Sequence, residues 1–132
     1  MSHEARCSCG ELRVICEGAP VRVSMCHCLA CQRRTGSVFG VQSRWRTDQV
    51  ATFGTPREFT RIGDSGKPVT FSFCGTCGTT LWWRLARDEG LIAVAVGGFA
   101  DPSFPPPKVV VYEECMHPWT AMPALVGAEH HR

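Results

Sequence analysis

The chain has 132 residues, which is enough for one domain and too short for two comfortable ones. Hydrophobic residues make up 44% of it and charged residues 20%, a globular balance that excludes a disordered or fibrous protein. The formal net charge is only +2 and no long run of like charges is present, so we expect no nucleic-acid partner.

The start of the chain gives no sign of export. Residues 1–7, Met-Ser-His-Glu-Ala-Arg-Cys, mix acidic and basic groups without an apolar segment, so we do not expect a secretory signal. The longest nearly apolar stretch, 91–100, is too short to span a bilayer, so we expect no membrane partner. We therefore expect a cytoplasmic protein whose nine cysteines stay reduced, and reduced cysteines in clusters favour metal binding over disulfides.

Glycine and proline divide the chain into short segments with the composition of strands. Strands are predicted over 11–16, 21–25, 38–42, 69–73, 80–84, 91–96 and 108–112. One short helix is predicted from near Cys28, and Gly36 would suit the position just past its end. The prediction is one mostly β domain.

The last part of the chain is predicted to contain less regular structure. Four prolines in 101–107 exclude a helix or a central strand, so this segment should be an extended surface connection. The tail 123–132 is expected to be loosely held. The expected domain is therefore 1–132, with its core over about 4–120.

Two distant cysteine pairs have the spacing of a closed zinc site. Cys74-Gly-Thr-Cys77 is a turn in which two sulfurs can approach one ion at about 2.3 Å. Cys7 and Cys9 are two residues apart on an extended segment, so they project to the same side and are the natural partners. We expect these four cysteines to hold a structural zinc. The alternative, a redox-active Cys74/Cys77 pair, would be expected beside a βαβ pattern that the sequence lacks.

The middle cluster, Cys26, Cys28 and Cys31, offers three ligands to a second zinc. Three protein ligands with one open position are typical of a catalytic zinc, and a sulfur-rich site favours another thiolate as the fourth ligand. We therefore expect a small thiol as the substrate. In the alternative interpretation, Cys115 closes the site as a fourth structural ligand.

Three other features of the sequence bear on these clusters. His27 should point away from the neighbouring sulfurs and is expected to be a surface or hydrogen-bonded histidine, and with His117 it is a weak candidate for a general base. Cys16 lies within a strand and is expected to be a small buried hydrophobe. Candidate groups for binding a substrate's carboxylates follow the middle cluster in sequence. They are Arg33, Arg34, Thr35, Gly36 and Ser37, and Arg44 and Arg46 add charge soon after. Each arginine could equally belong to a solvated face.

The order of the motifs resembles a known family. Cys-x-Cys-Gly is followed by Cys-His-Cys-x-x-Cys, then Arg-x-Thr-Gly-Ser-x-Phe, then Phe-Cys-Gly-x-Cys-Gly. This order is similar to that of the glutathione-dependent formaldehyde-activating enzymes, a family that includes centromere protein V. The similarity runs from Cys7 to about Trp119, and Glu113, Pro118 and Trp119 also look like the family's C-terminal signature.

The resemblance implies an Mss4-like fold of two small antiparallel sheets with short helical turns. It implies one structural zinc at the outer four cysteines and a second, catalytic zinc at the middle three, where an open site could also stand vacant. It further implies a carbon–sulfur lyase that joins glutathione and formaldehyde into S-hydroxymethylglutathione. The alternative function is a non-catalytic, zinc-stabilised binding module on the same fold.

Overall fold

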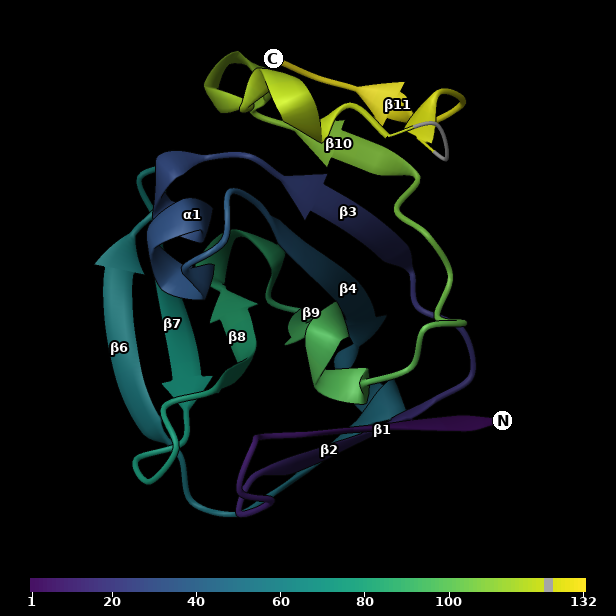
Figure 1. Cartoon of the computed structure of the whole chain (residues 1–132). Helices are drawn as coiled ribbons and strands as arrows, with labels where there is room; N and C mark the ends of the chain where they lie inside the picture. Colours follow the sequence, from purple (N-terminus) through teal and green to yellow (C-terminus); the bar gives the residue numbers. More distant parts are fainter. Residues whose placement is uncertain (123–124) are drawn as a thin grey trace.

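A computed structural model describes residues 1–122 and 125–132 (Figure 1). The strands are β1 (Ser2–Arg6), β2 (Arg13–Glu17), β3 (Arg22–Cys26), β4 (Gly40–Arg46), β5 (Val50–Phe53), β6 (Arg57–Ile62), β7 (Pro68–Phe73), β8 (Thr80–Leu85), β9 (Leu91–Ala95), β10 (Val109–Val111) and β11 (Glu129–His130). The helix is α1 (Leu29–Thr35), and short 3-10 turns lie at Thr47–Gln49, Ala86–Asp88, Val96–Phe99, Glu113–Cys115 and Pro118–Thr120. The prediction of a mostly β chain is confirmed.

A three-stranded antiparallel sheet, in the order β1-β2-β5, holds the start of the chain. Along β2, buried residues alternate with more exposed ones, and Val14 and Cys16 are fully buried. Cys16 is therefore the small buried hydrophobe that the sequence predicted. Strand β1 was not predicted, because its residues include no β-branched or aromatic side chain, and only Ala5 is buried.

The second sheet is larger than expected, with eight strands in the order β11-β10-β3-β4-β9-β8-β7-β6. Most neighbours are antiparallel, but β10 runs parallel to both β3 and β11. This sheet therefore differs from the small antiparallel sheets that the resemblance implied. A parallel pair needs a crossover connection, and the proline-rich segment 101–107 belongs to the connection that brings the chain from β9 to the side of β3. That segment contains no strand, as predicted.

The main hydrophobic core lies between the two sheets. Trp45 on β4, Leu81 on β8 and Ile92 on β9 are fully buried, and they belong to one cluster with Leu12 and Val14 from the small-sheet side. The cores of both sheets therefore depend on each other, and whatever holds the two sheets together also protects this cluster from water.

The opposite face of the large sheet carries a second, smaller apolar group. Trp82 and Trp83 are adjacent on β8 and project to opposite faces, so Trp82 joins the main core while Trp83 packs with Val69, Phe71 and Ala93. The ring centroids of Phe71 and Trp83 are 5.6 Å apart. Val69, Phe71 and Trp83 of this group line a cleft beside α1.

Helix α1 has the ends that the sequence predicted. The backbone N–H of Cys31 donates to the sulfur of Cys28, which precedes the helix. Gly36 follows the helix with φ 72°, a left-handed conformation that favours glycine, and its N–H donates to the carbonyl of Gln32 at 2.9 Å. The helix therefore begins at the middle cysteine cluster and fixes two of its members.

The tail extends the large sheet beyond β10. The N–H of Glu129 donates to the carbonyl of Lys108 at 2.9 Å, and the N–H of His131 donates to that of Val110 at 2.8 Å. Within the tail that we expected to be loosely held, 123 and 124 lie outside the described residues. Among the helices that the structure describes, none combines the length and the apolar character needed to cross a membrane.

Candidate metal centres

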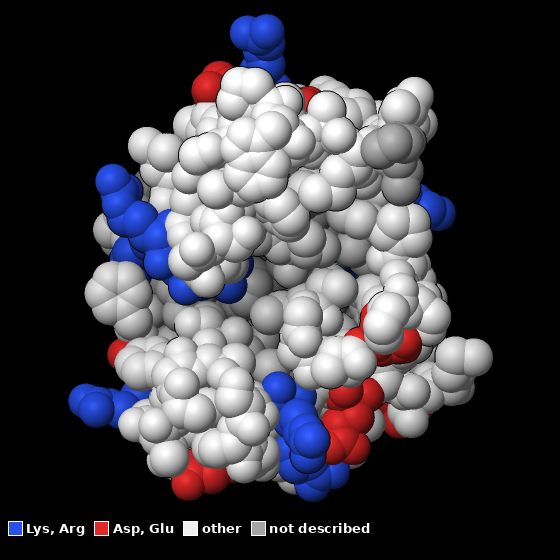
Figure 2. Space-filling model, in the orientation of Figure 1, with Lys and Arg blue, Asp and Glu red and all other residues white. Residues whose placement is uncertain are grey.

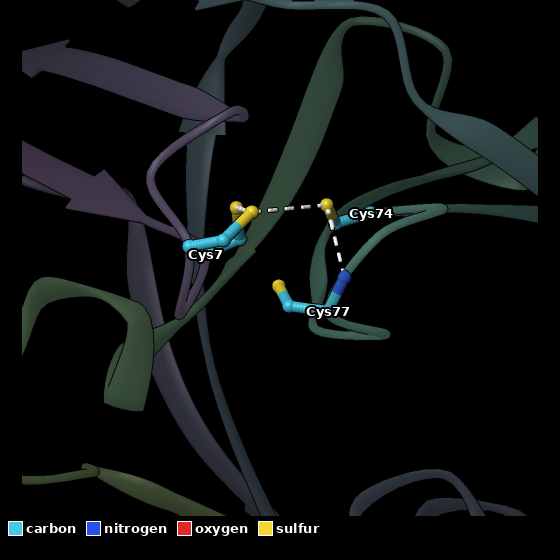
Figure 3. A group of neighbouring side chains, drawn as sticks. Cys7, Cys74 and Cys77 are labelled. Carbon is cyan, nitrogen blue, oxygen red and sulfur yellow. Dashed lines mark hydrogen bonds between the residues drawn. The ribbon is translucent and has the colours of Figure 1, made fainter.

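Four cysteine sulfurs from two distant turns converge where the two sheets meet (Figure 3). Cys7 and Cys9 lie between β1 and β2, and Cys74 and Cys77 lie between β7 and β8. The sulfurs of Cys7 and Cys9 are 3.7 Å apart, those of Cys9 and Cys74 are 3.5 Å apart, and all four lie within 4.8 Å of one another. Four sulfurs placed tetrahedrally around zinc at 2.3 Å would be about 3.8 Å apart. The group therefore has the dimensions of a closed four-sulfur metal site.

The turn between β7 and β8 supplies hydrogen-bond donors to its sulfurs. Gly78 takes a positive φ of 82° and its N–H donates to the carbonyl of Cys74 at 2.8 Å, which closes the turn. The N–H of Cys77 donates to the sulfur of Cys74 at 3.5 Å. A hydrogen bond from the Thr79 hydroxyl lowers the pKa of Cys77 to about 5. Such donors favour the thiolate form, which is the form that binds metal.

Polar contacts around the four sulfurs also join the two sheets. The N–H of Ser8 donates to the hydroxyl of Thr79 at 3.2 Å, and the hydroxyl of Thr76 donates to the carboxylate of Glu11 at 3.0 Å. The turn between β1 and β2 is therefore held against the turn between β7 and β8 by side chains as well as by sulfur. A bound ion would complete this junction.

The middle cluster forms a second group of three sulfurs. Cys26 ends β3, Cys28 precedes α1 and Cys31 lies in its first turn, and the three sulfurs lie within 4.8 Å of one another. Hydrogen bonds from Cys26 and then Cys31 lower the pKa of Cys28 far below that of a free thiol. The group could hold a metal through three sulfurs and leave one position open.

A cleft of about 780 Å³ opens beside the middle cluster. Phe71 and Trp83 line it, together with the three cysteines and residues of α1. Lys and Arg side chains gather around α1 in the view of Figure 2. Basic residues outnumber acidic ones along the cleft, because Arg22, Arg34, Arg44, Arg61, Lys67, Arg87 and Arg132 face Asp64, Glu114 and Glu129. Such a cleft attracts anionic ligands.

Neither Cys115 nor the two candidate histidines join the middle cluster. Cys115 lines the cleft but does not belong to the group of three sulfurs, so it does not close the site in this structure. His27 is 1% exposed, burial lowers its pKa, and among the described residues its Nδ1 has no hydrogen-bond partner, so it is neither a surface nor a fully bonded histidine. His117 Nε2 lies 3.2 Å from the side-chain oxygen of Gln32. Neither histidine lines the cleft.

Of the five residues expected to bind substrate, the structure places Arg34 in the cleft. Its guanidinium lies 4.3 Å from the ring centroid of Trp83, a cation–π contact that fixes its position. Gly40 leaves room for it, because a Cβ there would be 2.8 Å from Arg34 Nη2. The hydroxyl of Thr35 donates to the carbonyl of Cys31 at 2.9 Å. The other four candidates are exposed and lie outside the cleft lining: Arg33, Thr35, Gly36 and Ser37.

Sequence reasoning missed Tyr112, which follows β10 and lines the cleft. Hydrogen bonding to the neighbouring carboxylate of Asp64, and then burial, raise the pKa of Tyr112 to about 12, so its hydroxyl stays protonated at neutral pH. The residue has φ 58°, a left-handed conformation that is uncommon for a bulky side chain. No local motif marks this residue, the single tyrosine of the chain. It reaches the cysteines only through the parallel pairing of β10 with β3, a long-range contact that the sequence does not show.

Comparisons with known proteins agree with this architecture. No curated protein sequence matches the chain significantly. A crystal structure of a Rhodobacter sphaeroides protein is similar in fold, with a TM-score of 0.57 and 14% sequence identity over 98% of this chain and 99% of that one. A family model described as glutathione-dependent formaldehyde-activating enzyme matches residues 2–115. The chain therefore belongs to the glutathione-dependent formaldehyde-activating enzyme family.

Proposed function

We propose that this protein is a zinc-dependent carbon–sulfur lyase that joins a small thiol to an aldehyde, as in the formation of S-hydroxymethylglutathione from glutathione and formaldehyde. The observation that carries the proposal is the group of three cysteine sulfurs, without a fourth protein ligand among the described residues, at the wall of a basic cleft. We further propose an Mss4-like fold and a reducing compartment such as the cytoplasm, where the nine thiols can serve as ligands.

The residues present fit two zinc ions with different roles. The four sulfurs of Cys7, Cys9, Cys74 and Cys77 match a closed structural site, and the three of Cys26, Cys28 and Cys31 match an open one. Thiolates are soft ligands that zinc accepts readily. When bound in the open site, zinc supplies a Lewis-acidic position that favours the thiolate form of a substrate thiol.

The residues around the open site can bind and orient both reactants. Arg34 can hold a carboxylate of the thiol while its other face stays on Trp83. If it turns from the carboxylate of Asp64, the Tyr112 hydroxyl can donate its hydrogen bond to the aldehyde oxygen, which gains negative charge as the carbon–sulfur bond forms. In the net reaction the thiol proton is lost and the new hydroxymethyl oxygen gains one, so no oxidant or reductant is needed. Phe71 provides an apolar wall that limits water.

The test compares metal content and rate in matched cysteine variants. The wild-type protein should hold two zinc ions per chain by elemental analysis and should accelerate the exchange between glutathione and formaldehyde, measured by NMR. Cys28→Ser should hold one zinc ion and lose the acceleration. Cys115→Ser removes a cysteine that lines the same cleft outside the sulfur group, so it should keep both.

The same experiment separates the enzyme from a zinc-stabilised binding module. A module would hold its structural zinc and fold normally, yet glutathione and formaldehyde would react at the uncatalysed rate in the presence of either variant or the wild type. Acceleration that persists in Cys28→Ser would also count against the proposal, because it would place the chemistry away from the three sulfurs.

A further inference from the structure

Three arginines lie at the end of the cleft near the start of β3, whereas the middle cysteine cluster lies near the end of that strand. Arg22 on β3 pairs in register with Arg44 on β4, and Arg87 lies in the 3-10 turn after β8. All three line the cleft and also line an adjoining cavity of about 450 Å³ that Asp88 completes. Two neighbouring hollows therefore share one group of guanidinium side chains, which we call the arginine group.

The arginine group is not neutralised by the protein. Asp88 accepts from Arg44 Nη1 at 2.8 Å and lies 3.6 Å from Arg87 Nε. Among the described residues Arg22 forms no ion pair, so three positive charges face one carboxylate. Burial and the neighbouring positive charge of Arg22 lower the pKa of Arg44. A bound anion would relieve this repulsion.

Buried polar atoms at the same place lack partners. Arg44 is 8% exposed and Gln42, two residues away on the same strand face, is 7% exposed, and both line the cleft. Within the described part of the chain, no hydrogen-bond partner is present for Arg44 Nε, Arg22 Nε or Gln42 Oε1. Buried polar groups in folded proteins are normally bonded, so these atoms indicate a ligand with acceptor oxygens and a neighbouring N–H or O–H donor.

Strand geometry sets the distance from this group to the middle cluster. Cys26 and Arg22 are four residues apart on β3 and both line the cleft, so their Cα atoms are about 13 Å apart at about 3.4 Å per residue. A ligand whose sulfur reaches the cysteines and whose oxyanion reaches the arginines must therefore be longer than cysteine. In a tripeptide thiol with its sulfur on the central residue, the terminal carboxylates lie one to two residue lengths from the sulfur, at about 3.3–3.6 Å per extended residue, and the long arginine side chains can cover the remaining distance.

We infer that Arg22, Arg44 and Arg87 form an oxyanion site that binds the far end of an extended thiol substrate. The inference rests on the proposed function and specifies its substrate class: a thiol that carries a carboxylate or phosphate at least one to two residue lengths from its sulfur. Guanidinium groups bind carboxylates and phosphates alike through paired hydrogen bonds, so the same three arginines could hold either group.

The first arm of the test measures binding without catalysis. S-methylglutathione, whose sulfur is blocked, is titrated into the zinc-loaded protein and followed by NMR. Arg22→Gln and Arg87→Gln should each weaken its binding by about tenfold, because each removes charge-assisted hydrogen bonds. Arg87 has a half-exposed side chain, so its variant is expected to fold even if a change at buried Arg44 does not. The control is Arg46→Gln: Arg46 is on β4 with Arg44 but lines neither the cleft nor the adjoining cavity, so this variant should bind S-methylglutathione as tightly as the wild type.

The second arm identifies the oxyanion and separates this inference from the proposed function. Glutathione, a pantetheine phosphate and cysteamine are compared as thiols, and only thiols with an oxyanion should show a KM that rises in the arginine variants. If the KM for glutathione rises more, the site binds a carboxylate. If the KM for the pantetheine phosphate rises more, the site binds a phosphate. Turnover with unchanged KM and unchanged S-methylglutathione binding in Arg22→Gln and Arg87→Gln would overturn the site while leaving the enzyme intact. Weakened binding without turnover would support the site and count against the lyase.

Discussion

Loss of the closed sulfur group should destabilise the fold far more than loss of the open one. The perturbation is Cys77→Ser, which removes one exposed ligand without changing the main core. A metal that joins Cys9 to Cys74 closes a loop of 65 residues. The chain-entropy relation for a cross-link of that length gives about 4 kcal/mol at 25 °C. That is a large part of the free energy of unfolding of a typical domain, about 5–15 kcal/mol.

The matched comparison is Cys28→Ser in the open group. Serine is a favoured residue at the position before a helix, so this variant keeps a hydrogen-bond acceptor for the N–H of Cys31 while it removes a metal ligand. The open group spans only a few residues of sequence, so the metal there constrains a short loop. We expect its free energy of unfolding to fall by less than about 2 kcal/mol.

Urea denaturation, followed by tryptophan fluorescence, measures both values under the same zinc concentration. The free energy of unfolding of Cys77→Ser should be lower than that of the wild type by at least about 4 kcal/mol, so the variant should unfold at urea concentrations at which the wild type stays folded. Equal losses in the two variants would refute the reasoning, because they would show that the two groups do not divide into a structural and an open site. A Cys77→Ser variant as stable as the wild type would refute it as well.

Three further predictions concern single groups. Gly40→Ala should displace the guanidinium of Arg34 and raise the KM for glutathione several-fold, with a stability change below about 1 kcal/mol because only a flexible side-chain end must move; an unchanged KM would contradict this. Tyr112→Phe should reduce kcat about tenfold or more without changing zinc content, whereas a change in KM alone would show a binding role. Hydrogen bonding to the carbonyl of Leu125 and then to Glu113 raises the pKa of His130, so its stabilisation of β11 is present below about pH 6.5 and is lost as pH rises through the raised pKa. Amide exchange in β11, corrected for intrinsic rates, should therefore accelerate above that pH, and His130→Gln should remove the dependence.

Local sequence patterns predicted the parts of the fold that depend on local chemistry. The glycine at 36, the two-residue cysteine turn at 74–77 and the buried alternation around Cys16 each carry their own structural signal. Strand β6 was not predicted because it is an exposed edge: Arg57–Ile62 is almost entirely solvent-accessible, so no alternation of buried residues marks it. Strand β4 runs on to Arg46 because Trp45 enters the main core, a contact that only the assembled sheets provide.

The candidate site shows the same division. The four-sulfur group was predictable because each half is a local motif and the two halves complete one tetrahedron. The residues that shape the cleft come from long-range pairings that no motif announces. Tyr112 arrives through the parallel strand β10, and Arg22 and Arg44 meet through the register of β3 and β4. Of the arginines that the sequence offered for substrate binding, Arg34 and Arg44 line the cleft, and most of its other lining residues come from segments distant from the cysteine motif.

The two margins of the large sheet are protected from other chains in different ways. At one margin, β6 carries Arg57, Glu58 and Arg61, and charges along an edge discourage pairing with a second molecule. At the other margin, the final strand β11 has only two residues, which offers little template for intermolecular pairing. Removing the segment that follows β9 would expose β3, a longer strand that ends at Cys26, so such a truncated chain should self-associate through the edge next to its open sulfur cluster.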